Sequence, residues 1–441
     1  MQLRFQVCIH FLITSLTAIM ALWALPSSAQ TLAECQQEAQ SNYPLIRRYQ
    51  LVERTAQADI ANISKGWLPQ ITAYAQATAQ DKVVALPDAL AGMLSKQGAD
   101  IKGITKEQYK MGVDVTQTLY DGGRMKQQKA IVRSQSDVEQ AQDRVTLYAV
   151  RQRVNDLYFG LLLVEDRLKL NEDLHEVLLS NEKKVQNMVK SGTAATSDLY
   201  AIQSERINVE QAHTELGSQQ QALRNLLSLF IGRRVGQLTR PDRDTAMLSA
   251  FDSQDSISLH RPELDLFDRQ LSLLQTREKM LDRNLRPTLS AFAQGFYGYP
   301  GLNMYRDMMT RTPTLNGLIG IRAAWNISAL YTRKNDKMRL SQQRDMIANQ
   351  REVFTFNNRL ETTRHRANIE KYRQLRAQDE EMIRLHGLVR KAAESKLDHG
   401  IIDVNDLIKE VNSENAARIQ QSTHDIELLR EIYNLRYDLN Q

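Results

Sequence analysis

A long stretch without helix-breaking residues, from Arg124 to Ile231, is the feature that most constrains this chain. The stretch contains no proline, and Gly160 is its only glycine before Gly192. Apolar side chains recur along it every three or four residues, a spacing typical of a helix packed along its whole length on other helices. At 1.5 Å per residue, a helix from Arg124 to Lys190 would reach about 100 Å, so it needs a neighbour of similar length. The apolar positions include Val138, Ala141, Val145, Tyr148, Leu157, Leu161, Val164 and Leu168.

The neighbour predicted for this helix is the next segment of the chain, after a break near Gly192. Gly192 can end the first helix in the left-handed conformation, and Thr196 or Ser197 can cap the second. The same element returns 208 positions later, in a second region that contains no proline from Thr314 onward. There Gly400, Asp406 and Leu407 repeat Gly192, Asp198 and Leu199.

Proline spacing indicates that the duplication extends over most of the chain. Pro44 and Pro69 are 25 residues apart, and so are Pro262 and Pro287, at an offset of 218. The offset falls from 218 to 208, so one connection in the second half is ten residues shorter. Tandem repeats of this kind predict two structural copies joined by a linker. The predicted divisions are a signal peptide at 1–29, a first repeat at 30–240 (helix, two strands, helical hairpin), a linker at 241–260 and a second repeat at 261–441.

The first 29 residues have the pattern of a secretory signal peptide. Arg4 is followed by an apolar stretch, residues 11–25, and by the small residues that precede cleavage after Ala29. An uncleaved anchor is the alternative. Cleavage would leave Cys35 as the only cysteine, which excludes an internal disulfide, and we expect this side chain to be partly buried. The 57 basic and 52 acidic side chains are mixed throughout, which argues against nucleic-acid binding.

Four segments show a period of two, at residues 70–80, 110–119, 289–297 and 317–327. Odd-numbered positions are mostly apolar and even-numbered positions mostly polar, as expected for strands with two different faces. Two interpretations compete. The strands could form hairpins over a soluble core, or they could cross a bilayer as part of a β-barrel, for which about 9–11 tilted residues suffice. Four strands cannot close a barrel alone, so the second interpretation requires oligomerisation. The intervening loops, 81–108 and 298–314, lack regular periodicity.

Several short motifs occur in the same order in both halves of the mature chain. In the first half these are Asn42-Tyr43-Pro44-Leu45, Trp67-Leu68-Pro69, Leu119-Tyr120-Asp121-Gly122-Gly123-Arg124 and Gly192 with Asp198-Leu199; in the second, Arg261-Pro262-Glu263-Leu264, Leu285-Arg286-Pro287 and Gly400 with Asp406-Leu407. In the order and the duplication of these motifs, the mature chain resembles the TolC family of outer-membrane efflux proteins. Its second strand-to-helix junction departs from the usual pattern, with Ala329-Leu330-Tyr331 where Asp-Gly-Gly is common.

The resemblance implies a mainly α fold with membrane β: long antiparallel helical hairpins form an α-barrel in the periplasm of a Gram-negative bacterium. Four strands per protomer contribute to a trimeric twelve-stranded β-barrel in contact with outer-membrane lipid. Such a homotrimer exports drugs, other toxic small molecules or secreted substrates as the outer component of a tripartite efflux or type I secretion system. Its implied partners are a periplasmic adaptor (membrane fusion) protein and, through it, an inner-membrane pump of the RND or ABC type. No cofactor is implied.

The alternation of the strands and the resemblance together predict the functional residues. Adaptor docking is expected at the tips, where the alternative is that the glycines are only helix C-caps. Asp406 and Lys409 are expected at the periplasmic gate, where the alternative is a helix-dipole charge with its i+3 partner. The predicted positions are Gly192, Thr193, Gly400 and Ile401 for docking; Asp406 and Lys409 for the gate; Asp114 and Arg322 for the barrel lumen; and Ile71, Val113, Val115, Ile319, Ile321 and Trp325 for lipid contact.

The sequence argues against an enzyme. The eight histidines are scattered and show no metal-ligand spacing, and no phosphate-binding loop or nucleophile elbow occurs. The carboxylates at 379–381 lie in a highly charged helix, so we expect them on its solvated face. The alternative to an efflux channel is a periplasmic coiled-coil adaptor or a structural protein of the envelope.

Overall fold

The computed structural model describes residues 29–98, 101, 103–241 and 260–440. The predicted signal peptide, apart from its last residue, and most of the predicted linker lie outside these residues. The described chain is mainly helical with four strands, which confirms the predicted fold class. Its elements in order are α2 (Leu32–Asn42), α3 (Ile46–Ser64), η1 (Lys65–Trp67), β1 (Gln70–Ala79), α4 (Asp88–Lys96), β2 (Glu107–Tyr120), α5 (Arg124–Lys190), α6 (Thr196–Ile231), α8 (Pro262–Asn284), β3 (Thr288–Tyr299), α9 (Met304–Thr310), β4 (Thr314–Ala324), α10 (Ala329–Asp398) and α11 (Val404–Leu439).

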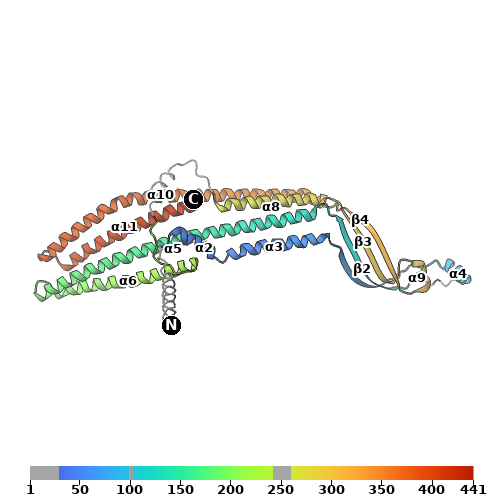
Figure 1. The fold of residues 1–441 in the computed structure, drawn as a ribbon, viewed down its shortest axis with the longest axis horizontal. Helices are drawn as coiled ribbons and strands as arrows, with labels where there is room; N and C mark the ends of the chain where they lie inside the picture. Colours follow the sequence, from blue (N-terminus) through green and yellow to red (C-terminus); the bar gives the residue numbers. More distant parts are fainter. Residues whose placement is uncertain (1–28, 99–100, 102, 242–259, 441) are drawn as a thin grey trace, which may run out of the picture. The chain divides into compact units, whose positions relative to one another are not determined.

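Two helical hairpins of nearly equal length dominate the chain (Figure 1). In the first, α5 has 67 residues and α6 has 36; in the second, α10 has 70 and α11 has 36. The starts of α6 and α11 are 208 positions apart, and so are the ends of α5 and α10. The two hairpins therefore have corresponding boundaries at the positions where the sequence repeats.

The four strands form one antiparallel sheet in the order β1-β2-β3-β4. A β-bulge shifts the register of β2 between Thr118 and Tyr120. The fourth strand was predicted at 317–327 but covers Thr314–Ala324, so Trp325 lies beyond its end. The loops predicted to lack regular structure contain two helices, α4 and α9. These helices are too short for a helical period to be recognised in the sequence.

The segment before β1, predicted as the helix that begins the first repeat, is instead three pieces. Helix α2 ends at Asn42 and α3 begins at Ile46, because Pro44 lacks the N–H that a continuous helix needs. The 3₁₀ turn η1 then leads into the strand. The second repeat has one unbroken helix, α8, in the place of α3.

The chain divides into two compact units. One unit comprises residues 49–142 and 265–351 and contains the sheet. In it Gln127 of α5 donates a hydrogen bond to the carbonyl of Thr276 in α8 at 2.8 Å, and Arg333 of α10 binds Asp282 of α8 at 2.7 Å. The second unit comprises residues 1–48, 143–264 and 352–441. It contains both hairpin turns and the largest apolar cores.

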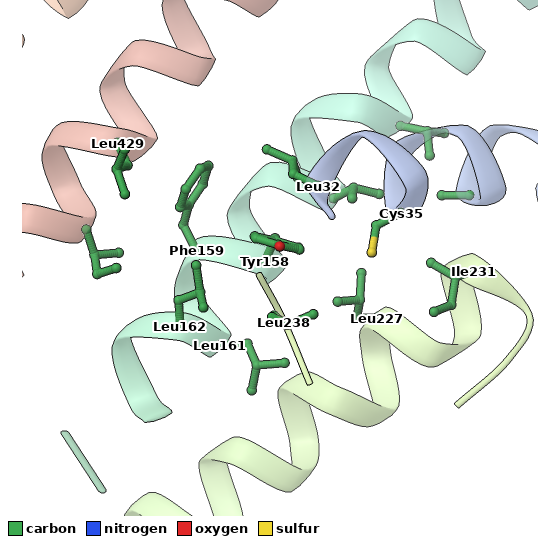
Figure 2. Packing of buried hydrophobic residues seen from close by; sticks show 14 residues of the cluster. Leu32, Cys35, Tyr158, Phe159, Leu161, Leu162, Leu227, Ile231, Leu238 and Leu429 are labelled. Atoms are coloured by element: carbon green, nitrogen blue, oxygen red, sulfur yellow. The ribbon is translucent and has the colours of Figure 1, made fainter. Parts of the chain in front are cut away.

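The main core of the second unit forms where α2, α5, α6 and α11 meet (Figure 2). Tyr158, Phe159 and Leu227 are fully buried there, and the labelled side chains point toward one another. Cys35, expected to be partly buried, is 0% exposed. Burial raises the pKa of its thiol to about 11, so the thiol stays protonated and unreactive near neutral pH.

A buried polar network joins α5, α11 and the start of the second repeat. Arg261 is 7% exposed, and its guanidinium lies 4.9 and 4.6 Å from the ring centroids of Tyr148 and Tyr437, which stack on each other. It also binds Glu263 at 2.6 Å and Asp438 at 3.4 Å. Burial of a charge is tolerated when it is paired and hydrogen-bonded in this way.

Two histidine–carboxylate pairs connect α10 with α11. His365 contacts Glu431 through Nδ1 at 2.5 Å and Asp438 through Nε2 at 3.4 Å. Asp379 contacts His424 at 2.9 Å, and both side chains are buried. The expectation that Asp379 lies on a solvated face is therefore wrong, because this carboxylate faces the partner helix, whereas residues 380 and 381 are exposed.

Candidate functional site at the helical tips and the sheet

The two hairpins end in the same kind of turn. Gly192 follows α5 with a φ of 76°, and Gly400 follows α10 with a φ of 68°. After each glycine, the N–H of Thr193 or Ile401 donates to the carbonyl five residues earlier, at 2.8 and 2.9 Å. This is the Schellman arrangement that ends a helix through a left-handed residue. Space around both glycines is open, so the constraint there is the backbone conformation rather than packing.

The helices that follow the turns begin with different caps. The carboxylate of Asp403 accepts the backbone N–H three residues later at 2.9 Å and caps α11. In α6 the N-cap is Ala195, whose own N–H donates to the carboxylate of Asp198 at 3.2 Å. The prediction that Thr196 or Ser197 caps α6 is wrong, because both already lie in its first turn. Asp198 reaches back from the third helical position to bind the cap residue.

The two tips form one composite surface. Lys184 of the first hairpin pairs with Asp398 of the second at 3.8 Å. An open hollow between the turns is lined by residues of both, Gly192 and Gly400 among them. Ile401 is 70% exposed at its edge. Beneath the hollow, buried apolar residues of all four helices pack together: Leu174, Leu178, Val185, Ile202, Val209, Ala393, Leu397, Val404, Leu407 and Val411.

The predicted gate residues lie at the start of α11. Asp406 is the third residue of this helix, is exposed and lines the hollow between the tips. Lys409 is exposed one turn later. Within the described part of the chain, no ion pair joins these two side chains. A carboxylate in the first turn of a helix interacts favourably with the helix dipole.

A charge triad that the sequence analysis missed lies on each hairpin near the tip. In the first hairpin Arg206 binds Glu182 at 2.9 Å and also contacts Glu210. In the second, 208 positions later, Glu414 contacts Arg390 and binds Arg418 at 2.6 Å. The three positions correspond, but every charge is reversed. Alignment of the two repeats at the offset of 208 would have revealed this exchange.

The sheet register separates the two predicted sets of strand residues. Ile71 pairs with Val115, and Val115 with Ala293, whereas Asp114 pairs with Gln294. Following the register across the sheet places the odd-numbered positions on one face and the even-numbered positions on the other. We call these the apolar face and the polar face. The apolar face carries Ile71, Val113, Val115, Ile319 and Ile321; the polar face carries Asp114 and Arg322.

Trp325 differs from the other residues predicted to contact lipid. It lies after the end of β4, and its indole N–H donates to the carbonyl of Leu285 at 2.8 Å. Its ring remains 60% exposed. An aromatic side chain with a satisfied N–H and an exposed ring suits the boundary of an apolar surface.

The two strand-to-helix junctions have different chemistry. At the first, Gly122 and Gly123 have φ values of 72° and 83°. The carboxylate of Asp121 accepts the N–H of Gly123 at 2.8 Å and that of Met125 at 2.6 Å. The second junction lacks these residues and enters α10 directly at Ala329. Both nonetheless lead a strand into a long helix.

Two further features of the described residues bear on the kind of site. No helix among them is both long and apolar enough to cross a membrane. No group of three or more histidine, cysteine, aspartate or glutamate side chains in the same residues is arranged to hold a metal ion.

Comparisons with known proteins agree with this geometry. A family model described as "Outer membrane efflux protein" matches residues 36–233. The fold is similar to that of the outer-membrane channel OprN, with a TM-score of 0.65 and 15% identity over 92% of this chain and 89% of that one. A membrane protein from Pseudomonas aeruginosa has a TM-score of 0.66 and 14% identity over 92% and 90% of the two chains. The CmeC outer membrane channel of Campylobacter jejuni has a TM-score of 0.63 and 12% identity over 92% and 85%. No curated protein matches by sequence.

Proposed function

Because the chain belongs to the outer membrane efflux protein family, we propose that three copies assemble into an outer-membrane channel with a periplasmic helical tunnel. This family is one of efflux proteins and not an enzyme class. The channel would export small molecules or secreted substrates together with a periplasmic adaptor and an inner-membrane pump. The single observation that best supports this function is a sheet with one apolar and one polar face on a chain with two duplicated helical hairpins.

The sheet supports assembly because its two outer strands, β1 and β4, are edge strands, each paired on one side only. Exposed strand edges pair readily with other chains unless they are covered. In an antiparallel sheet of four strands, β1 and β4 run in opposite directions, so β4 of one protomer can pair with β1 of the next. Three protomers would close a twelve-stranded barrel with the apolar face toward lipid.

Two measurements test this function. Purified outer membranes should contain a trimer that changes its gel mobility on heating, and the purified protein should form ion-conducting channels in planar bilayers. A periplasmic adaptor, the competing function, would fractionate elsewhere and would not conduct. A monomer without conductance would refute the channel.

Docking of an adaptor is proposed at the hollow between the tips. Gly192→Trp or Gly400→Trp should abolish efflux while the trimer remains intact, because a bulky side chain disrupts the left-handed turn and obstructs the hollow. The matched control is Gly217→Leu in α6, where space is also open and φ is not positive. Efflux that survives both tip substitutions would refute docking there.

Gating is proposed at Asp406 and Lys409. In a trimer, three copies of Asp406 would form a negative ring that favours cations at the entrance, and Lys409 would weaken that preference. Asp406→Asn should therefore lower the cation preference of reconstituted channels. Asp198→Asn, at the corresponding position of the first repeat, is the control. If Asp406→Asn changes neither conductance nor selectivity, Asp406 does not line the gate.

The orientation of the sheet is proposed from its two faces. A spin label at Val113 should report contact with lipid, and one at Asp114 should report contact with water, because these neighbours lie on opposite faces. The reverse accessibility would refute the assignment of the faces.

A further inference from the structure

The polar face of the sheet carries two aromatic side chains of β3 opposite glycines. Phe292 pairs with Gly320 of β4, and Phe296 pairs with Gly112 of β2. A Cβ atom at Gly320 would lie 2.9 Å from Cε1 and Cζ of Phe292. One at Gly112 would lie 2.7 Å from Cβ of Phe296. The glycines thus leave space for the aromatic side chains to lie against the sheet, an arrangement that stabilises glycine-containing strands.

A cationic side chain also lies over each of these aromatic rings. The guanidinium of Arg322 lies 4.8 Å from the centroid of Phe292. The ammonium of Lys110 lies 5.8 Å from the centroid of Phe296 and 5.9 Å from that of Tyr74. Cations within about 6 Å of a ring centroid are attracted by the ring quadrupole. The same set of glycine, phenylalanine and cation therefore occurs twice on one face.

The charges of the sheet are concentrated on this polar face. Among the residues of the four strands, it carries Lys110, Arg322 and Asp114, whereas the apolar face carries only Glu107. Asp114 is engaged within the sheet, since its Oδ1 accepts a hydrogen bond from Gln294 at 2.7 Å. The polar face thus has two cations against one acid, an excess of one positive charge per protomer.

We propose that the polar face is an anion-favouring wall, in which Phe292 and Phe296 hold Arg322 and Lys110 along the path of the solute. The inference rests on the proposed function, which assigns this face to the lumen. A guanidinium or ammonium that contacts a ring on one side still presents N–H donors to carboxylate, phosphate or sulfate groups on the other. Repetition in three protomers would surround the path with these donors. Anionic solutes would therefore cross the strand region more readily than cationic ones.

A cysteine reporter on the polar face measures this preference locally, without interference from charges at the periplasmic end. Ser290 pairs in register with Arg322, so Ser290→Cys places a thiol beside the cation. Anionic and cationic methanethiosulfonate reagents are applied to full-length protein in liposomes, and their reaction rates are compared with those of a free thiol. Cys35 is 0% exposed, so the protein without the reporter gives the background. We expect the anionic reagent to be favoured.

Removal of the cation should remove the preference. Arg322→Gln in the reporter protein should lower the ratio of anionic to cationic rates on the order of threefold, the size expected for one nearby charge screened by salt. Arg322→Lys should keep the ratio high. A ratio equal to that of the free thiol, or one unchanged by Arg322→Gln, would overturn the inference while the barrel stands. A thiol that reacts with neither reagent would overturn the barrel itself, and the inference with it.

Two glycines of β4 test the role of the ring. Gly320→Ala should displace the Phe292 ring, release Arg322 and lower the ratio, although less than Arg322→Gln does. Gly317→Ala is the matched control, because nothing lies within 4 Å of a Cβ atom at that position. Equal ratios in the two alanine variants would overturn the part assigned to Phe292.

Discussion

The two helical hairpins have nearly the same length and the same turn, yet at one set of corresponding positions their helices are joined by different chemistry. In the first, Leu157 and Leu223 pack against the main apolar core. The corresponding positions of the second, 208 residues later, are His365 and Glu431, a buried hydrogen-bonded pair. The nearby Phe230 of the first hairpin corresponds to Asp438 of the second. An apolar contact in one repeat is therefore an ionic network in the other.

This difference shows that the shape of the hairpin does not depend on a particular kind of interhelical contact. Helix length and turn position follow from backbone features that both repeats share: the absence of proline and a left-handed glycine at the tip. The contact between the two helices can then be stabilised either by burial of apolar side chains or by a buried pair of charges. The two solutions differ in their response to mutation, because an unpaired buried charge costs more than a lost methyl group.

The largest expected effect is the loss of one partner from the ionic pair. Glu431→Leu leaves His365 buried without its main partner and should lower the free energy of unfolding by about 3–5 kcal/mol. His365→Leu combined with Glu431→Leu restores the pair found in the first hairpin and should recover most of this loss. Urea unfolding of the detergent-solubilised protein, followed by circular dichroism, measures both. Equal loss in the single and double variants would show that the two interiors cannot be exchanged.

The next effect tests where the hairpins are alike. Leu227 and Leu435 occupy corresponding positions and are both 0% exposed. Replacement of either by alanine should cost about 2–5 kcal/mol through lost burial and a residual cavity. We expect similar values, measured by the same urea unfolding. A difference of more than about 2 kcal/mol would mean that the neighbouring network changes how well the second interior relaxes.

A third, smaller effect is a dependence on pH that only the second hairpin should show. Burial alone would lower the pKa of His365, but its hydrogen bonds to Asp438 and Glu431 raise the pKa from 6.5 to about 9. The bound proton stabilises the fold fully below about pH 6.5, and this stabilisation is lost as the pH rises through 9. Between these values the unfolding free energy should fall by up to about 3 kcal/mol.

The double leucine variant is the control for this pH dependence. Its stability should be nearly constant between pH 6.5 and 9, the interval in which the wild-type protein loses stability. Parallel decline of the two proteins in unfolding experiments across this range would assign the effect to other groups.

The smallest effect concerns the charge triads. Arg206→Glu places a negative charge beside Glu182 and Glu210. The substitution should lower the free energy of unfolding by about 1 kcal/mol, because these side chains are only partly buried. Reversal of all three charges reproduces the order of the second hairpin and should return the free energy of unfolding, measured with urea, to within about 0.5 kcal/mol of wild type. If the triple variant is no more stable than the single one, surrounding residues rather than the triad itself determine the sign.

Periodicity and punctuation in the sequence were sufficient to predict the architecture. The helices α5 and α10 are long enough for their apolar spacing to be unambiguous, and alternation located all four strands within a few residues. The tips followed from Gly192 and Gly400, where only a left-handed residue can end the helix in this way. These features depend on residues close together in the sequence, so a single sequence is sufficient to predict the helices, the strands and the tips.

Most of the features that escaped prediction depend on contacts distant in sequence. Asp379 and His365 lie in a strongly charged helix, and nothing in their neighbourhood shows that they face α11. The cation sites of the polar face combine residues of β2, β3 and β4, so Lys110 looked like any other polar position of a strand. The cap of α6 was mispredicted because Asp198 acts backwards on Ala195. Each of these features is determined by which residues contact one another, and local composition does not reveal those contacts.

The opposite sign of the two triads has a consequence for symmetry. In the proposed trimer the duplicated hairpins would follow one another around a ring with threefold symmetry and approximate sixfold symmetry. The triad at Arg206 has one cation between two acids and that at Glu414 one acid between two cations, of which Arg390 also pairs with Glu394, so the sign at each of the three corresponding positions would alternate around the ring. A subunit rotated by one hairpin would bring like triads together. Divergence of the two copies thus gives the ring a means of rejecting an arrangement that identical copies would accept.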